Sequence, residues 1–109
     1  PLSGLEKHAV TSVSADEEKS VRCCSEEGDK CYSPKPCLKM ISTYHEAYEV
    51  CLHYRDADDF DTELRLCTEE EAIALCCKQG CNIDREQYWL LSEGYERSGN
   101  THYAAYEYI

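Results

Sequence analysis

The sequence has neither a long apolar run nor an excess of basic residues, and these absences argue against a membrane-spanning or a nucleic-acid-binding protein. No apolar run approaches the roughly 18 residues of a membrane span, so we expect no membrane insertion. Basic residues number 11 against 22 acidic ones, which gives a net charge of −11. This charge argues against nucleic acid and anionic membrane surfaces as partners, and it favours a cationic partner or simple solubility in a crowded medium.

Motifs of the common enzyme classes are also missing. The sequence contains no suitable order of serine, histidine and aspartate, no phosphate-binding loop and no defensible pair of catalytic carboxylates. The segment that starts at His45 begins like the zinc-protease motif, but the second histidine of that motif is replaced by Glu49. We therefore expect a surface pair between His45 and Glu49, no cofactor and no enzymatic activity.

Cysteine, in contrast, is abundant. A cysteine content above about 8% in a short chain is typical of a disulfide scaffold, which persists where the surroundings oxidise thiols. The sequence therefore predicts a secreted or extracellular cell-surface protein, and because no hydrophobic leader opens it, we expect the processed form. The nine cysteines are Cys23, Cys24, Cys31, Cys37, Cys51, Cys67, Cys76, Cys77 and Cys81.

An odd number of cysteines leaves at least one without a partner inside the chain. That cysteine is either a buried thiol or a bridge to a second copy in a disulfide-linked homodimer. The segment 25–37 contains Gly28 and two prolines and is predicted to be a loop. We expect a Cys31–Cys37 bridge to close it.

Two pairs of adjacent cysteines carry geometric information. On a strand Cys23 and Cys24 point to opposite faces, and on a helix Cys76 and Cys77 diverge by about 100°. Each pair should therefore bond to two different partners. Zinc binding in a reducing compartment is the alternative, although the spacing lacks a Cys-x-x-Cys knuckle. The cysteines concerned are Cys67, Cys76, Cys77 and Cys81.

The hydrophobic pattern predicts a small α+β domain behind an arm. Residues 1–20 are polar, contain no cysteine and show no sustained period, so we expect a flexible N-terminal arm there, or the stub of a linker or pro-region. Residues 21–109 then form one disulfide-rich recognition domain. Threonine followed three residues later by glutamate is a capping box, which predicts helix starts at Thr43 and Thr68. The helices should pack on a short antiparallel sheet. The expected helices cover 43–54 and 68–78, and the expected strands cover 21–24, 63–67, 88–91 and 103–109.

The order of several short motifs resembles a known kind of module. These motifs are VRCCS at 21–25, RLCT at 65–68, CC at 76–77, GC at 80–81, Asp84 and Trp89. Together they resemble a cysteine-rich extracellular module of marine protists and invertebrates. The resemblance implies an extracellular domain and does not name a ligand.

Helix and strand spacing adds a second resemblance. The stretch from Thr43 through Ala47 to Cys51, followed by LRLCT at 64–68 and YWL at 88–90, is similar to the first half of the C-type-lectin-like fold. This resemblance implies a shortened version of that fold, with Cys51 bonded to a partner across the core. The sugar-site motifs Glu-Pro-Asn, Gln-Pro-Asp and Trp-Asn-Asp are missing, so it implies binding by a flat or grooved surface.

The densest cluster of carboxylates is a candidate calcium site. Calcium prefers several carboxylate oxygens from one flexible loop, but the EF-hand pattern is broken by Phe60 and by the lack of a glycine at the turn. The alternative is a solvated charged loop. The carboxylates are Asp56, Asp58, Asp59, Asp61 and Glu63.

Nine tyrosines supply amphipathic rings of the kind enriched in binding surfaces. Tyr103, Tyr106 and Tyr108 lie close together near the end of the sequence. They either pack a terminal strand against the sheet or contribute to a recognition surface.

These features predict a non-enzymatic recognition or adhesion module, secreted or at the cell surface. We expect it to bind a protein receptor or a glycan through an aromatic and acidic face. The alternative is a diffusible cysteine-rich signalling protein that acts through a receptor, similar to the pheromones of ciliates.

Overall fold

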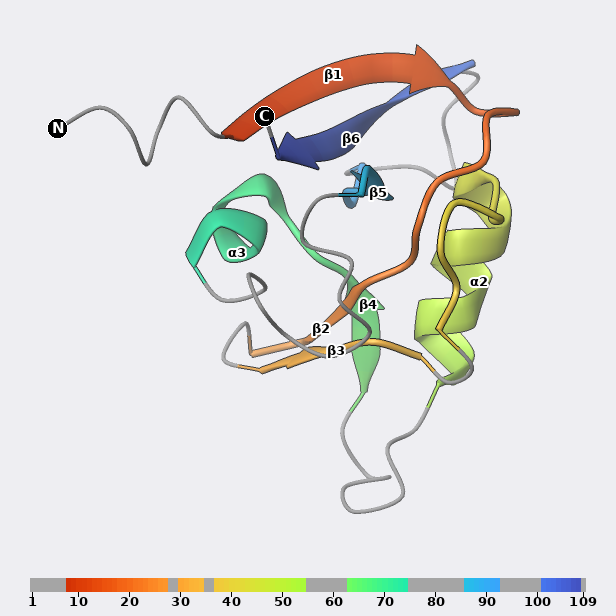
Figure 1. Ribbon diagram of the computed structural model, residues 1–109. Coiled ribbons are helices and arrows are strands. Elements are labelled where there is room, and N and C mark those ends of the chain that lie inside the picture. Colours follow the sequence, from red (N-terminus) through yellow and green to blue (C-terminus); the bar gives the residue numbers. More distant parts are fainter. Residues whose placement is uncertain are drawn as a thin grey trace, which may run out of the picture.

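The first strand of the protein falls in the segment that was predicted to be an arm. The computed structural model describes residues 8–27, 30–34, 37–54, 63–74, 86–92 and 101–108. In it, β1 (His8–Ser14) pairs antiparallel over its whole length with β6 (His102–Tyr108), as Figure 1 shows. Further along the predicted arm, Lys19 and Ser20 are buried. The arm prediction is therefore wrong for residues 8–20, because the strand that stabilises β1 lies at the other end of the chain and leaves no local period.

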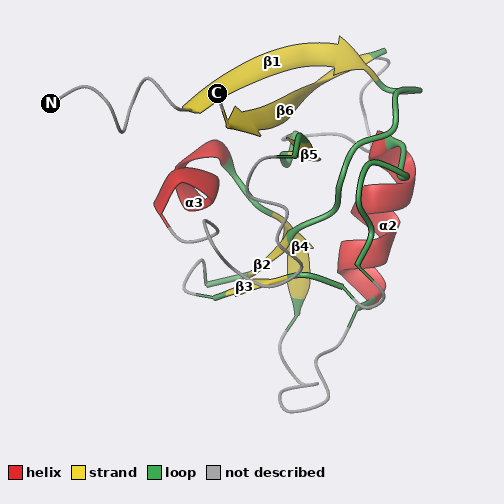
Figure 2. Cartoon of the chain, viewed as in Figure 1, coloured by secondary structure: helices red, strands yellow, loops and turns green. Residues whose placement is uncertain are grey.

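The described elements form two small sheets and two helices (Figure 2). One sheet has the order β1-β6-β5 and the other has the order β3-β2-β4. The prediction of a small disulfide-rich α+β domain is confirmed, with two antiparallel sheets in place of one. The remaining elements are β2 (Cys23–Ser25), β3 (Cys31–Tyr32), α2 (Tyr44–His53), β4 (Leu64–Leu66), α3 (Glu69–Ala74) and β5 (Tyr88–Trp89).

Both predicted capping boxes form. At α2 the hydroxyl of Thr43 accepts from the amide of Glu46, and the Glu46 carboxylate accepts from the Thr43 amide at 2.8 Å. At α3 the Glu71 carboxylate accepts from the amide of Thr68 at 2.9 Å, and the Thr68 hydroxyl accepts from the Glu71 amide. Each box provides acceptors for amides that have no partner within the helix, so both helices begin where the sequence predicts.

Two disulfides that start from adjacent residues of β2 connect the elements. Cys23 is bonded to Cys51 on α2. Cys24 is bonded to Cys67, which directly follows β4. The prediction that adjacent cysteines on a strand reach different partners is confirmed for this pair, and β2 is thereby crosslinked in two directions.

The largest core cluster lies between α2 and the two sheets. Tyr44 and Trp89 are fully buried, with their rings in an edge-to-face contact 5.4 Å apart. The indole nitrogen of Trp89 donates to the carbonyl of Ser42 at 2.8 Å, and the Tyr44 hydroxyl accepts from the amide of Ser92. The polar end of each ring is therefore satisfied while its apolar body is buried.

Candidate binding face

The structure places the candidate calcium ligands mostly outside its described residues. Of the five carboxylates only Glu63 is described, and it is exposed. Its backbone carbonyl accepts from the amide of Glu26 at 3.2 Å. Calcium binding by Asp56, Asp58, Asp59, Asp61 and Glu63 stays a prediction.

Three sulfur atoms gather beside β2. Those of Cys24, Cys31 and Cys67 lie within 4.8 Å of one another, a spacing that would suit a shared metal ion. Cys24 and Cys67 are bonded to each other, however, and Cys31 is also disulfide-bonded. A metal binds the thiolate form of cysteine, so in the oxidised protein these sulfurs serve as crosslinks.

The predicted Cys31–Cys37 clip is not confirmed. Both residues are disulfide-bonded, but neither takes part in the two bridges that join described residues. All six described cysteines are disulfide-bonded. The leftover cysteine expected from the odd number must therefore be sought among Cys76, Cys77 and Cys81, which lie outside the described residues.

The tyrosines near the end of the sequence contribute to the core. Tyr103 retains 5% of its exposure and stacks on Tyr44 with ring centroids 4.1 Å apart. Tyr106 retains 1% and lies against Tyr88 at 4.8 Å. Of the two expected roles, Tyr103 and Tyr106 therefore have the first: they pack the terminal strand against the core, and their rings are too buried to form a recognition surface. The side chain of Tyr108 lies outside the described residues.

A different segment presents apolar side chains to solvent. Met40 is 37% exposed and Ile41 is 55% exposed, immediately before the first capping box. Met40 has a φ of 55°, in the left-handed region that a side chain with a Cβ atom disfavours. Its amide donates to the buried hydroxyl of Ser20 at 3.0 Å. The fold thus holds a strained residue in place with its side chain outside the core.

An acidic turn follows β1. The amide of Glu17 donates to the Ser14 carbonyl at 3.0 Å, and the Glu17 carboxylate accepts from the Ser14 amide at 3.2 Å. The same carboxylate lies 3.2 Å from the ammonium group of Lys19, which is buried and also donates to the Gln87 side chain. Lys19 offsets only one acidic charge of this turn.

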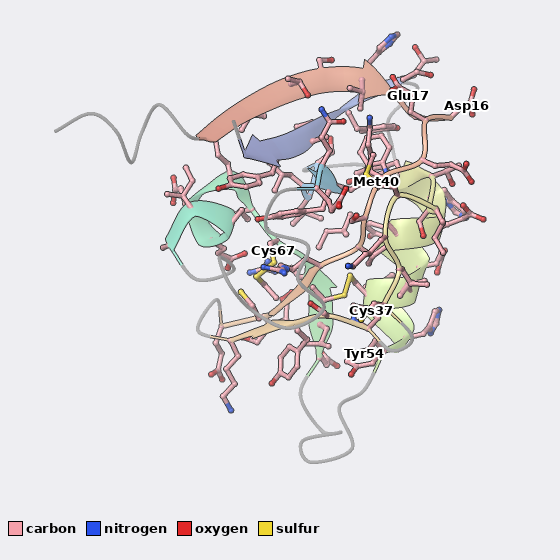
Figure 3. The ribbon with its side chains drawn as sticks, in the orientation of Figure 1. Asp16, Glu17, Cys37, Met40, Tyr54 and Cys67 are labelled. Carbon is pink, nitrogen blue, oxygen red and sulfur yellow. A yellow bond between two sulfur atoms is a disulfide. The ribbon has the colours of Figure 1, made fainter. Side chains whose placement is uncertain are left out.

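The acidic turn and the apolar pair lie side by side. Lys19 and Ser42 exchange two backbone hydrogen bonds, of 2.8 and 3.1 Å, and the amide of Tyr44 donates to the carbonyl of Ala15. Residues 16–18 are therefore neighbours of residues 41–43, and Figure 3 shows Asp16 and Glu17 at the same end of the molecule as Met40. We call this surface the Met40 face. It consists of the exposed residues Asp16, Glu17 and Glu18 of one segment and Met40 and Ile41 of the other, and the exposed Lys39 lies next to Met40 in sequence.

The first turn of α2 adds negative charge beside this face. The hydrogen bond from the Thr43 amide lowers the pKa of the Glu46 carboxyl, which is fully exposed. Further along the same helix, Glu49 pairs with His45 at 3.8 Å and with His53 at 3.3 Å. The predicted His45–Glu49 surface pair is confirmed, and Glu46 places an exposed carboxylate in the first turn of the helix, next to the Met40 face.

Sequence reasoning missed the Met40 face, although two signals in the sequence point to it. Met40 and Ile41 precede a capping box and lie outside the periodic apolar face of the helix. The second signal is the run of three acids at 16–18, which comes directly after the uncharged stretch 9–15. Neither signal indicates that the two segments are neighbours, because their pairing depends on single bridges between distant residues.

The comparisons with known proteins add no relative. No protein-family model, curated protein or solved structure matches this chain. Within the described part of the chain, none of the helices combines the length and the apolar character needed to cross a membrane.

Proposed function

We propose that this protein is a non-enzymatic extracellular recognition module that binds a cationic protein partner through the Met40 face. The observation that carries the proposal is Met40 itself, a non-glycine residue with a φ of 55° and an exposed side chain. Strain of this kind costs roughly 1–3 kcal/mol and persists at sites where the rest of the fold enforces it. Glycine at this position would avoid that cost. We therefore infer that the exposed methionine side chain has a role that offsets the strain.

Chemistry favours a protein over a glycan as the partner. Methionine is enriched in protein interfaces, and its flexible thioether adapts to varied apolar surfaces. Glycan binding, the other expectation, has less support because the rings of Tyr103 and Tyr106 are buried. The acids beside Met40 and the net charge of −11 would attract a partner that carries basic residues.

The extracellular setting is supported by the oxidised cysteines. All six described cysteines are disulfide-bonded, a state that oxidising surroundings maintain. The likeness to the cysteine-rich module of marine organisms, and to a shortened C-type-lectin-like fold, is part of the proposal. It is supported by the chain order of α2, β4, α3 and β5 and by the crosslink from α2 to β2.

Competition on cells of the producing organism tests this proposal. Fluorescently labelled protein is bound to the cells and displaced with unlabelled wild-type protein or with the double variant Met40→Ser, Ile41→Ser. We expect the variant to compete at least about tenfold less well, since it removes the apolar centre of the contact. Protease treatment of the cells should abolish binding, while glycosidase treatment should leave it intact.

The matched control is Ile73→Ser. Ile73 is 42% exposed, similar to Met40, but it belongs to α3, which Figure 1 shows well separated from the start of α2. This variant should compete as well as the wild type. Equal competition by the Met40 and Ile41 variant would contradict the proposal, and loss of binding after glycosidase treatment alone would identify a glycan as the partner.

A further inference from the structure

β1 leads into the acidic turn of the Met40 face, and its edge opposite β6 carries backbone amide and carbonyl groups. Alternate residues of an antiparallel strand direct their amide and carbonyl groups to opposite edges. The amide of Ala15 donates to the Thr101 carbonyl at 2.8 Å, which extends the pairing of β1 with β6 by one residue. Counting back from Ala15, Val13 and Thr11 also face β6.

The residues between them face the other way. Ser14, Ser12 and Val10 direct their backbone groups away from β6. A second hydrogen bond supports this alternation. The amide of Leu90 donates to the Ala104 carbonyl, so the backbone groups of Ala104 point to β5 and those of its two neighbours in β6 point to β1. The outward pairs of amide and carbonyl groups on β1 therefore belong to even-numbered residues.

Ser14 closes one end of this outward edge. Both backbone groups of Ser14 bond to Glu17. Within the part of the chain that the structure describes, no residue bonds to the outward groups of Val10 or Ser12. The opposite edge of the same sheet is covered, because Ser20 bonds to Gln87, directly before β5, and to Trp89 in β5.

The edge also lacks the usual protection against added strands. Natural edge strands are commonly short, bulged, or interrupted by lysine or proline. β1 is seven residues long, pairs in an unbroken register, and has no lysine, arginine, acid or proline in its sequence HAVTSVS. A long regular edge of this kind is a template for strand addition.

We propose that the outward edge of β1 binds an extended basic segment of the partner as an additional strand. This inference rests on the proposed function and names its binding mode. The added strand would bond to the backbone of Val10 and Ser12 and run toward the acids at 16–18, where its lysine or arginine side chains find opposite charge. A second copy of the chain fits less well, because two chains of charge −11 repel each other.

The probe is a synthetic peptide of five Lys-Val repeats, and its control is a peptide of five Lys-Pro repeats. The two carry the same charge, but alternate residues of the Lys-Pro peptide have no amide hydrogen and the peptide does not form a strand. Isothermal titration should show that the wild type binds the Lys-Val peptide at least about tenfold more tightly than the Lys-Pro peptide, since only the first can donate and accept along the edge.

Ser12→Pro tests the edge directly. It removes the outward amide of residue 12 and leaves the bonds of Thr11 and Val13 to β6 in place. Binding of the Lys-Val peptide should weaken by about tenfold or more. The control Ser12→Ala removes the hydroxyl but keeps the amide, so its affinity should equal that of the wild type. Thermal unfolding of both variants checks that the fold is retained, and Val10→Pro repeats the test if Ser12→Pro does not fold.

The outcomes separate this inference from the proposed function. Equal affinity for the two peptides, or equal affinity of Ser12→Pro and wild type, overturns strand addition, while the competition experiment with Met40 and Ile41 still decides the proposed function. A wild-type dimer in sedimentation velocity that Ser12→Pro abolishes would assign the edge to a second copy and overturn the basic partner.

Discussion

The amide of Met40 donates to the hydroxyl of Ser20 over 3.0 Å, and this bond holds a methionine with a φ of 55° at the surface. Ser20 is fully buried, and its backbone bonds to Gln87 and to Trp89 of β5. A buried residue, Ser20, thus helps to hold the backbone conformation of the exposed Met40. Substitution of Met40 can therefore test the backbone strain and the binding role of the side chain separately.

Replacing Met40 with glycine should stabilise the fold and weaken binding. Glycine adopts positive φ without steric cost, so we expect the free energy of unfolding to rise by as much as about 1 kcal/mol, less the entropy that glycine gains in the unfolded chain. Urea unfolding measures the first effect and the cell competition measures the second. Met40→Ala keeps the Cβ atom and should give no stabilisation. Lower stability of the glycine variant than of the alanine variant would contradict a strained backbone.

Acid should destabilise the protein partly through Glu71. Both oxygens of this carboxylate accept from the Arg65 guanidinium, at 2.7 and 2.9 Å. Arg65 is the main reason that the pKa of Glu71 lies below its ordinary value of 4.5, and the Thr68 amide lowers it further. A carboxyl with a lowered pKa stabilises the fold above its unfolded-state pKa, and this stabilisation is lost as the pH falls through the folded-state value.

Glu71→Gln provides the measurement. At neutral pH the variant should lose about 1–2 kcal/mol of unfolding free energy, because a charged hydrogen-bonded pair is reduced to a neutral one. The difference from the wild type should shrink below pH 4.5, where the unfolded carboxyl is already protonated. Glu70→Gln, at an exposed neighbouring position, is the control and should show little difference. A deficit for Glu71→Gln that is constant from pH 7 to about pH 2 would contradict this role.

Mass spectrometry of the unreduced protein should find the Cys23–Cys51 and Cys24–Cys67 bridges. They close loops with separations of 28 and 43 residues, for which chain entropy predicts about 3.5 and about 4 kcal/mol of stabilisation. Removing either bridge by paired Cys→Ala substitution should lower the unfolding free energy by about 3 kcal/mol, less than the separate loops predict, because the remaining bridge shortens the loop that the other one closes. Peptides that link Cys23 to Cys67 would contradict the observed pairing.

The same mass-spectrometric experiment can identify the cysteine that has no partner within the chain. An alkylating reagent added before reduction should leave the six described cysteines unmodified, because all of them are disulfide-bonded. Modification of Cys31 or Cys37 at full occupancy would contradict this state. A dimer in solution that reduction dissociates would assign the remaining cysteine to a bridge between chains.

Tyr103→Ala should be a stability variant and not a binding variant. Its ring stacks on Tyr44 in the core, so truncation should cost about 3–5 kcal/mol of unfolding free energy. Tyr103→Phe keeps the stacked ring and should cost far less. If Tyr103→Ala unfolds like the wild type but fails to compete on cells, the ring belongs to a recognition surface after all.

Local signals in the sequence predicted local structure well. Thr43 with Glu46, and Thr68 with Glu71, specify their capping boxes within four residues, and both boxes form. The hydrophobic pattern likewise predicted a strand over 63–67, where β4 forms. In each case the interacting residues are close in sequence, so a pattern can record them.

Contacts between residues far apart in the chain could not be predicted from the sequence. β1 is stabilised by β6 across nearly the whole chain, and HAVTSVS has no strict alternation to reveal it. Tyr103 and Tyr106 are attractive interface residues by composition, but burial is decided by Tyr44 and Tyr88, which the sequence places elsewhere. The Met40 conformation depends on Ser20, twenty residues earlier, and no local motif records that bond.

The two crosslinks at Cys23 and Cys24 also shape how the chain oxidises. Because both begin at one point of β2, forming Cys23–Cys51 brings the stretch that leads to Cys67 close to Cys24, and the second closure then spans only the segment between Cys51 and Cys67. Oxidation should proceed in that order during refolding. We expect the principal kinetic error to be an exchange of partners between the two neighbouring thiols, which thiol–disulfide exchange would reverse.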